Sequence, residues 1–220
     1  MKFQQARQTV VKTCIALADR GYLAGTGGNM ALRAGGDHML VTPSGVDYYT
    51  MDAGDICVIR LSDREQVEGS MEASVEAGMH VRVLAARPDC LASVHTHQPI
   101  ASAYTLLAAP LAFKGNSLRL MLGAEVPCVA YAPSGTGMLA RKVGKIFNAT
   151  THACLMRNHG VVCVGTSIDE AVSRVAALES ACADFFRSNQ VASPPEREQT
   201  GTLIRQTLQA VANQPLGSSR

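Results

Sequence analysis

The sequence predicts a single large α/β domain, in which helices pack on a mixed or antiparallel sheet. Helical and strand patterns interleave along most of the 220 residues, which predicts an α/β fold. Several adjacent strands are joined by short turns, and short turns fit antiparallel neighbours rather than a regular doubly wound parallel sheet. The composition, with 47% apolar and 17% charged residues, is that of a globular chain with a full core.

The first part of the chain predicts one amphipathic helix followed by short strands. The helix covers residues 3–20, where Val10, Cys14 and Leu17 recur at helical spacing, and Gly21 ends it. A glycine-rich turn follows the helix. The apolar stretches after this turn predict strands at residues 31–33, 38–41 and 56–59.

A second helix is expected over residues 71–87, and Pro88 closes it. Its apolar residues lie on two sides of the helical wheel, which predicts a largely buried helix. Glu72, Glu76 and His80 follow one another at intervals of four residues and therefore share one stripe of this helix. A glutamate on a buried helix needs a partner, because an isolated buried charge is costly. Glu76 is the stronger candidate for such a role, since Glu72 is expected to be more exposed.

The second half of the chain continues the alternation of strands and helices. Strands are expected at residues 90–94, 126–130, 153–156 and 161–164, and helices at residues 98–107, 136–147 and 168–188. One predicted domain spans residues 1–190. The sequence Ala-Ser-Pro-Pro at residues 192–195 indicates a linker, so residues 191–220 are expected to form a linker, a short helix at 200–213 and a frayed tail.

The composition argues against several classes of partner. The formal net charge of +2 predicts no strong attraction to nucleic acid or to a membrane surface, and the absence of tryptophan disfavours base stacking. The most apolar long stretch, residues 101–113, is too short to span a bilayer. The seven cysteines form no C-x-x-C pair and are expected to be reduced core residues. With no signal-like N-terminus, these features predict a cytoplasmic protein.

Three histidines are the strongest candidates for a chemical site. His95 and His97 stand two residues apart at the end of a strand, so their side chains point to the same side. His159 lies between two apolar runs. Three imidazoles form a common catalytic zinc site that keeps a fourth position open, and cobalt and manganese remain alternatives. An isolated histidine is usually an ordinary turn residue, but the pair favours metal binding. The unpaired histidines are interpreted as structural: His38, His80 and His152.

Two turns have the composition of anion-binding loops. Residues 25–29 (Gly-Thr-Gly-Gly-Asn) match neither a dinucleotide fingerprint nor a Walker A loop, but their glycines let backbone N–H groups converge. Residues 42–45 (Thr-Pro-Ser-Gly) add a hydroxyl to the same kind of turn. Each pattern alone is equally typical of a simple tight turn.

Taken together, these motifs resemble the class II aldolase/adducin family. The resemblance covers about residues 5–187 and consists of five motifs in order, at residues 25–29, 42–45, 74–80, 94–97 and 158–160. It implies a three-layer α/β/α domain with a mainly antiparallel central sheet. It also implies a homotetramer of C4 type with active sites at the subunit interfaces.

The resemblance assigns roles to residues of this chain. The family's zinc-binding histidines match His95, His97 and His159, and its catalytic glutamate matches Glu76. Its substrate- and phosphate-binding loops match Thr26, Gly28, Asn29, Ser44, Gly45 and Ser74. These roles imply a zinc-dependent lyase that cleaves a C–C bond next to a carbonyl in a small phosphorylated ketose. Zinc would stabilise the enediolate, and the glutamate would move the proton.

Two departures from the family pattern leave the reaction open. Val75 stands where family aldolases often carry a second serine or threonine, so one phosphate donor is missing. The region 111–123 lacks the tyrosine that a neighbouring subunit supplies, for which Tyr104 or Tyr131 could substitute. A decarboxylase of a 3-keto-acid phosphate is therefore the alternative. Epimerisation is less expected, since the family's 4-epimerases carry aspartate in place of Glu76. A non-enzymatic, adducin-like interaction domain is the alternative from another class, and the retained histidines disfavour it.

Overall fold

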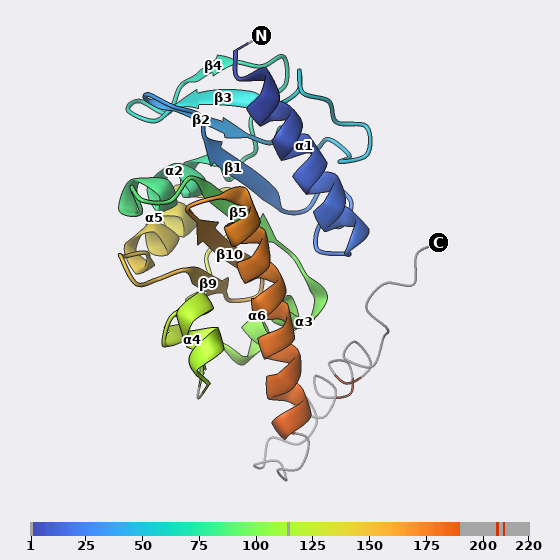
Figure 1. Ribbon diagram of the computed structural model, residues 1–220, viewed down its shortest axis with the longest axis vertical. Coiled ribbons are helices and arrows are strands. Elements are labelled where there is room, and N and C mark those ends of the chain that lie inside the picture. The colour runs from blue at the N-terminus through green and yellow to red at the C-terminus, as the bar shows by residue number, and fades with distance from the viewer. Residues whose placement is uncertain (1, 114, 190–205, 207–208, 210–220) are drawn as a thin grey trace.

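The computed structural model describes residues 2–113, 115–189, 206 and 209. In this part of the chain a central sheet lies between two layers of helices (Figure 1). The three-layer α/β/α fold with a mainly antiparallel sheet is confirmed. The predicted linker and last helix, in residues 191–220, lie outside the described residues, except that Gln206 and Gln209 are helical.

The central sheet has eight strands, and a separate small sheet has two. The strands of the large sheet are β1 (Asn29–Arg33), β2 (His38–Val41), β3 (Cys57–Arg60), β4 (Gln66–Glu68), β5 (Ala92–Thr96), β8 (Cys128–Val129), β9 (Ala153–Met156) and β10 (Gly160–Gly165). Their order is β4-β3-β2-β1-β5-β10-β9-β8. All neighbours are antiparallel except β8 and β9. The small sheet pairs β6 (Leu111–Ala112) with β7 (Glu125–Val126). Strands β5 and β10 therefore occupy the middle of the fold.

The helices are divided between the two faces of the sheet. They are α1 (Gln4–Asp19), α2 (Ala77–Ala86), α3 (Pro99–Tyr104), η1 (Thr105–Leu107), α4 (Asn116–Leu122), α5 (Gly137–Ile146) and α6 (Ile168–Asn189). One hydrophobic core joins the sheet to α1, α3, α4 and α6. A second core joins the opposite face to α2 and α5. The sheet is thus covered on both sides, which explains why its central strands read as continuous apolar runs.

The second helix begins later than its sequence pattern predicts. The expected helix at residues 71–87 is shortened, because the segment before α2 pairs with the loop that follows β2. The N–H of Ser74 donates to the carbonyl of Thr42 (3.0 Å), and the carbonyl of Glu72 accepts from the N–H of Ser44 (2.8 Å). These bonds hold the segment in an extended conformation. The prediction that Glu72 shares a helical stripe is therefore wrong, and Glu72 is exposed.

A strand predicted at residues 126–130 is divided between two sheets. The strands β7 and β8 flank Pro127, whose nitrogen carries no hydrogen for a ladder bond. Its carbonyl accepts from the N–H of Leu155 (2.9 Å), so the chain turns from one sheet to the other there. The short elements β4, β6 and α4 were not predicted. The remaining predicted helices and strands are present, with small shifts at their ends.

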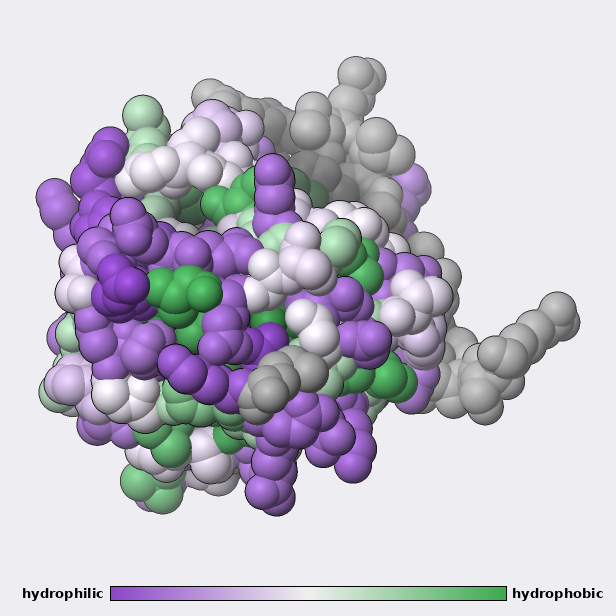
Figure 2. Space-filling view, turned by 90° about the horizontal axis from the view of Figure 1, so that it is seen from above, coloured by the Kyte–Doolittle hydropathy of each residue, from purple (hydrophilic) through white to green (hydrophobic). Residues whose placement is uncertain are grey.

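The surface and the cysteines agree with the composition. All seven cysteines are free, and only Cys128 is not fully buried, so the predicted core thiols are confirmed. Figure 2 shows that the end of the molecule seen from above is mostly hydrophilic, with separate small apolar areas. No helix among the described residues has the length and apolar character required to cross a membrane.

Candidate metal centre

Strand β5 carries the first histidine to the middle of the sheet. His95 pairs with Asn29 of β1 on one side and with Val162 of β10 on the other. Val94 belongs to the core shared with α1 and α6. Because successive strand residues face opposite sides, Ser93 and His95 face the α2 and α5 layer. The site therefore lies on that face, where β5 ends.

The turn between β9 and β10 brings the third histidine to the end of β5. His159 lies in this turn, and its N–H donates to the carbonyl of Met156 (3.1 Å). The next residue, Gly160, lies so close to β5 that an added Cβ would be 2.5 Å from the carbonyl oxygen of Thr96 and 2.7 Å from Cδ2 of His97. Only glycine permits this approach. The hairpin turn and the strand end are thereby held together.

The three histidines converge as the sequence predicts. One ligand nitrogen from each of His95, His97 and His159 lies within 4.8 Å of the others, and the Nε2 atoms of His95 and His97 are 3.0 Å apart. His95 is fully buried, whereas His97 and His159 are partly exposed. The cluster therefore has a closed side inside the sheet and an open side toward solvent.

The protonation of these rings fits a metal site. Nδ1 of His95 lies 2.8 Å from the carbonyl oxygen of Val161, which can only accept, so Nδ1 carries the hydrogen and Nε2 offers a lone pair. Burial, together with the neighbouring rings of His95 and His159, lowers the pKa of His97 to about 4. Burial and His95 also lower the pKa of His159. Neutral imidazoles are the form that binds a metal ion.

Glu76 forms the fourth side of the cluster. It is the N-cap residue of α2 and is only 5% exposed. Its Oε2 lies 3.1 Å from Nε2 of His95, and its Oε1 lies 3.4 Å from Nε2 of His159. Burial raises the pKa of this carboxyl, but the surrounding His95, Asn29 and His159 outweigh burial and hold the pKa below its usual range. Glu76 is therefore a carboxylate at neutral pH.

A chain of hydrogen bonds leads away from Glu76 into the core. Nδ2 of Asn29 donates to Oε2 of Glu76 (2.9 Å), and Oδ1 of Asn29 lies 2.7 Å from Nε2 of His80. Nδ1 of His80 lies 2.7 Å from the hydroxyl of Ser93. His80 lies outside the metal cluster, which agrees with its structural interpretation, yet it contacts the amide that holds Glu76. The spacing of four residues between Glu76 and His80 was the only sequence signal for this contact.

A residue that sequence reasoning missed also holds the carboxylate. The hydroxyl of Ser134, in the loop before α5, donates to Oε1 of Glu76 (2.8 Å). Ser134 is otherwise exposed. No motif marks this serine, because the contact joins residues that are far apart in the sequence.

The glycine-rich turn packs directly against the histidine strand. Gly28 has φ +80°, and an added Cβ would lie 2.4 Å from Leu23 and 2.8 Å from the carbonyl oxygen of His95. The carbonyl of Gly28 accepts from the hydroxyl of Tyr48 (2.6 Å). Thr26, in the same turn, is exposed. The turn thus reaches from the metal cluster to the surface.

The other predicted anion-binding residues adjoin this turn through the start of β1. The N–H of Thr42 donates to the carbonyl of Met30 (3.1 Å), which places the loop with Ser44 and Gly45 beside β1. Gly45 is exposed and Ser44 is partly exposed. The hydroxyl of Ser74 accepts from the N–H of Glu76 (3.2 Å) and so fixes the start of α2. The N–H of Ser44 is already bonded, as described above.

Three residues were named in connection with the departures from the family pattern, and they have different surroundings. Val75 is 66% exposed and lies next to Glu76, before the start of α2. Tyr104 is buried against Phe185, and its hydroxyl donates to the carbonyl of Pro110 (3.0 Å). Tyr104 therefore lies in the core on the other face of the sheet and cannot serve this site. Tyr131 is 54% exposed on the segment that leads to Ser134.

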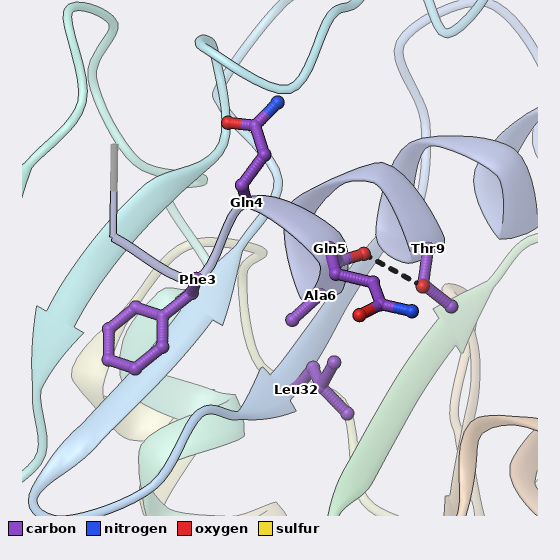
Figure 3. A pocket seen from close by; sticks show the side chains of 6 residues that line it. All are labelled: Phe3, Gln4, Gln5, Ala6, Thr9 and Leu32. Atoms are coloured by element: carbon purple, nitrogen blue, oxygen red, sulfur yellow. Dashed lines mark hydrogen bonds between the residues drawn. The ribbon is translucent and has the colours of Figure 1, made fainter.

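Three surface cavities of the described residues lie away from the histidine cluster. One of them, of about 560 Å³, lies beside the first turn of α1. Figure 3 shows its lining residues, which include Phe3, Ala6 and Leu32. Two others lie beside α4 and between α1 and α6. None of these three cavities includes a histidine of the cluster, so the candidate site is defined by its side chains and their geometry.

The chain matches known proteins over most of its length. The family model described as Class II Aldolase and Adducin N-terminal domain matches residues 8–185. A 5-methylthioribulose-1-phosphate/5-deoxyribulose-1-phosphate aldolase of Rhodospirillum rubrum is 31% identical over 174 residues, covering 79% of this chain and 77% of the relative. An L-fuculose phosphate aldolase of Methanococcus maripaludis is 30% identical over 170 residues, covering 77% and 89%.

Solved structures show the same fold. The structure of an L-fuculose-1-phosphate aldolase from Thermus thermophilus aligns with a TM-score of 0.71 and 28% identity, covering 86% of this chain and 99% of that chain. Another structure, described as L-fuculose 1-phosphate aldolase, aligns with a TM-score of 0.79 and 24% identity, covering 95% and 98%.

Proposed function

The chain belongs to the class II aldolase and adducin family, and from that premise we propose that it is a metal-dependent lyase. It cleaves a C–C bond next to a carbonyl in a small phosphorylated ketose. The observation that carries this function is the convergence of three imidazoles on the buried carboxylate of Glu76. The relatives named for aldolases of fuculose and ribulose phosphates support the reaction and the substrate class.

Three residues of this chain hold the metal. His95, His97 and His159 each offer a ring nitrogen to one divalent ion, and the donor set suits zinc, with manganese and cobalt as alternatives. When bound, the ion supplies Lewis-acid stabilisation of the negative charge that develops on the substrate's carbonyl oxygen. The open side formed by His97 and His159 gives the substrate access.

Glu76 carries the proton. When the C–C bond breaks, its electron pair stays on the carbon next to the carbonyl, and that carbon must gain a proton before the product leaves. The carboxyl of Glu76 delivers this proton and removes it again in the synthetic direction. Its lowered pKa makes the carboxylate the resting form, so the proton it delivers is the one that the substrate's hydroxyl releases when its carbon becomes the aldehyde carbonyl.

The two turns beside the cluster, which reach the surface at Thr26 and Gly45, bind the substrate's phosphate. Backbone N–H groups at Gly28 and Gly45 and the hydroxyls of Thr26 and Ser44 supply donors at this edge. The further donors of this anion site are the second amide hydrogen of Asn29 and the hydroxyl of Ser74.

A decarboxylase is the second candidate. Val75 presents an exposed apolar side chain at the site where a hydroxyl would help to bind phosphate. Residues 111–123 contain no tyrosine to take the hydroxyl proton from the carbon that becomes the aldehyde, or to return it in the synthetic direction, and carbon dioxide loss needs no such group. A 3-keto-acid phosphate would leave the same enediolate after decarboxylation. A homotetramer with shared sites stays a prediction.

A substrate screen tests the function and separates the candidates. The zinc-loaded protein is offered phosphorylated and free ketoses and keto-acids, and aldehyde and carbon dioxide release are followed separately. Aldehyde release from a ketose phosphate is the expected result. Carbon dioxide release alone identifies the decarboxylase. A protein that binds no metal and turns over none of these compounds with added zinc or manganese would contradict the lyase and favour an interaction domain.

A further inference from the structure

The two oxygens of Glu76 are each held by a neutral group outside the metal cluster. Oε2 accepts from Nδ2 of Asn29 at 2.9 Å, and Oε1 accepts from the hydroxyl of Ser134 at 2.8 Å. Nε2 of His95 and of His159 also faces this carboxylate, but these nitrogens are the atoms offered to a metal ion. Asn29 and Ser134 are therefore the groups that hold the carboxylate when the cluster is loaded.

Asn29 can hold Glu76 only in one orientation of its amide. With the NH₂ group toward Glu76 it donates a hydrogen bond, whereas the flipped amide would place its oxygen against a carboxylate oxygen. The two orientations have nearly the same shape, so packing does not choose between them. The choice depends on the group at the other end of the amide, which is Nε2 of His80 at 2.7 Å.

The ring of His80 is itself fixed by burial and by Ser93. His80 is fully buried, and burial lowers its pKa to about 3, so the ring is neutral and carries one hydrogen. If Ser93 donates to Nδ1, the hydrogen sits on Nε2 and is donated to Oδ1 of Asn29. In the opposite tautomer the hydrogen is on Nδ1. The lone pair on Nε2 would then face Oδ1 of Asn29, or the amide would have to flip and turn its oxygen toward Glu76. One direction of donation, from Ser93 through His80 and Asn29, satisfies every bond.

We propose that His80 is a positioning residue, which acts through Asn29 to orient the carboxylate of Glu76, while Ser134 holds the other carboxylate oxygen from the exposed loop. His80 touches neither the metal ligands' coordinating atoms nor the solvent-facing side of the site. This role in turnover rests on the lyase function proposed above. His80 holds the carboxylate of Glu76 in the orientation in which it can reach the substrate carbon.

Two substitutions of His80 separate positioning from packing. His80→Gln keeps an amide N–H that can reach Oδ1 of Asn29, and His80→Met keeps volume but offers no donor. We expect His80→Met to lower kcat about 10–100-fold with KM and zinc content near wild type, and His80→Gln to recover most of that loss. The matched control is His152→Met, which changes a partly buried histidine without a contact to Glu76.

Equal activity of His80→Met and wild type would overturn the positioning role, and so would equal losses in His80→Met and His80→Gln. If His80→Met does not fold, the Ser134 pair supplies the comparison. Ser134 is exposed, so Ser134→Ala removes one hydroxyl from a surface loop, and Ser134→Thr keeps it. A kcat about tenfold lower in Ser134→Ala than in Ser134→Thr is expected. Identical kcat values in the two variants would contradict this part of the inference.

A spectroscopic measurement tests the orientation without any substrate. Long-range ¹H–¹⁵N NMR of the zinc-loaded protein reports which ring nitrogen of His80 carries the hydrogen. The expected result is a single neutral Nε2–H tautomer between about pH 5 and 8. An Nδ1–H tautomer, or a mixture of the two, would overturn the inference. Because no turnover is needed, an inactive wild type would count against the lyase function and leave this result valid.

Discussion

The Nε2 atom of His95 and the Oε2 atom of Glu76 lie 3.1 Å apart. A protonated His95 donates from Nε2 to this oxygen and lowers the pKa of Glu76, but a neutral ring uses its single hydrogen on the carbonyl of Val161, and both atoms are then acceptors. Two buried acceptors at this distance repel each other unless a cation lies against them. At the scale of single residues, this pair is the strongest argument that the cluster binds a metal ion.

Removal of one imidazole tests this argument. His95→Ala and His159→Ala are each expected to lose tight zinc binding, because two imidazoles remain where three are needed. Metal analysis after dialysis against a weak chelator measures the change. His152→Ala serves as the control and should keep its zinc. Stoichiometric zinc in either cluster variant would show that these rings are not ligands.

The role of Glu76 in proton transfer can be separated from metal binding. Glu76→Gln keeps the shape of the side chain and its contact with Asn29 but removes the proton carrier. We expect zinc content to stay at the wild-type level and turnover to fall about 10²–10⁴-fold. Steady-state kinetics on the substrate found by the screen give the result. A variant as fast as wild type would exclude Glu76 as the acid–base group.

The proximity of the histidines could be predicted from the sequence, because their spacing carries information. The two histidines on β5 are two residues apart, and a strand places such side chains on one side. Ser134 carried no such signal, since it reaches Glu76 only because the loop before α5 folds over the start of α2. Asn29 was assigned to substrate alone, because a sequence pattern does not show that both ends of its amide are bonded within the core.

At the scale of elements, the centre is built where β5 ends against the β9–β10 turn. Both elements appear in the sequence as apolar runs, and this part of the fold was predicted correctly. The start of α2 was predicted incorrectly, because a helical wheel cannot represent backbone hydrogen bonds to a distant loop. The extended segment that contains Ser74 owes its shape to those bonds. Local periodicity therefore predicts the elements better than their ends.

The glycine in the hairpin turn tests this junction. Gly160→Ala would place a methyl group 2.5 Å from the carbonyl oxygen of Thr96 and 2.7 Å from the ring of His97, so the turn must shift. We expect a loss of about 1–3 kcal/mol in the free energy of unfolding, together with weaker zinc binding. Urea unfolding and metal titration measure the two effects. In Gly115→Ala the added methyl meets open space, and that variant should keep wild-type zinc affinity. Unchanged zinc affinity in Gly160→Ala would contradict the close approach.

At the scale of the whole molecule, one buried and one half-buried imidazole make the metal-free protein sensitive to acid. His97 and His80 have pKa values lowered to about 4 and about 3, whereas unfolded histidines titrate near 6.5. Below pH 6.5 the unfolded chain therefore binds more protons than the folded chain. Their contribution to stability is present above this pH and is lost progressively as the pH falls toward 4 and 3.

The stability of the zinc-free protein should consequently fall between pH 7 and pH 4.5. Urea unfolding in the presence of a chelator, at a series of pH values, measures the free energy of unfolding. His80→Gln should show a shallower decline, because it removes one of the titrating rings. A flat profile for wild type over this range would mean that these histidines are not buried as neutral rings.

Zinc K-edge X-ray absorption of the purified, zinc-loaded protein tests the central claim most directly. We expect one zinc per chain, with imidazole nitrogens as the protein ligands at about 2.0–2.1 Å and any remaining ligands light atoms. The chain has seven cysteines that could compete for zinc. Sulfur scattering near 2.3 Å, or fewer than three imidazoles around the ion, would contradict the site formed by His95, His97 and His159.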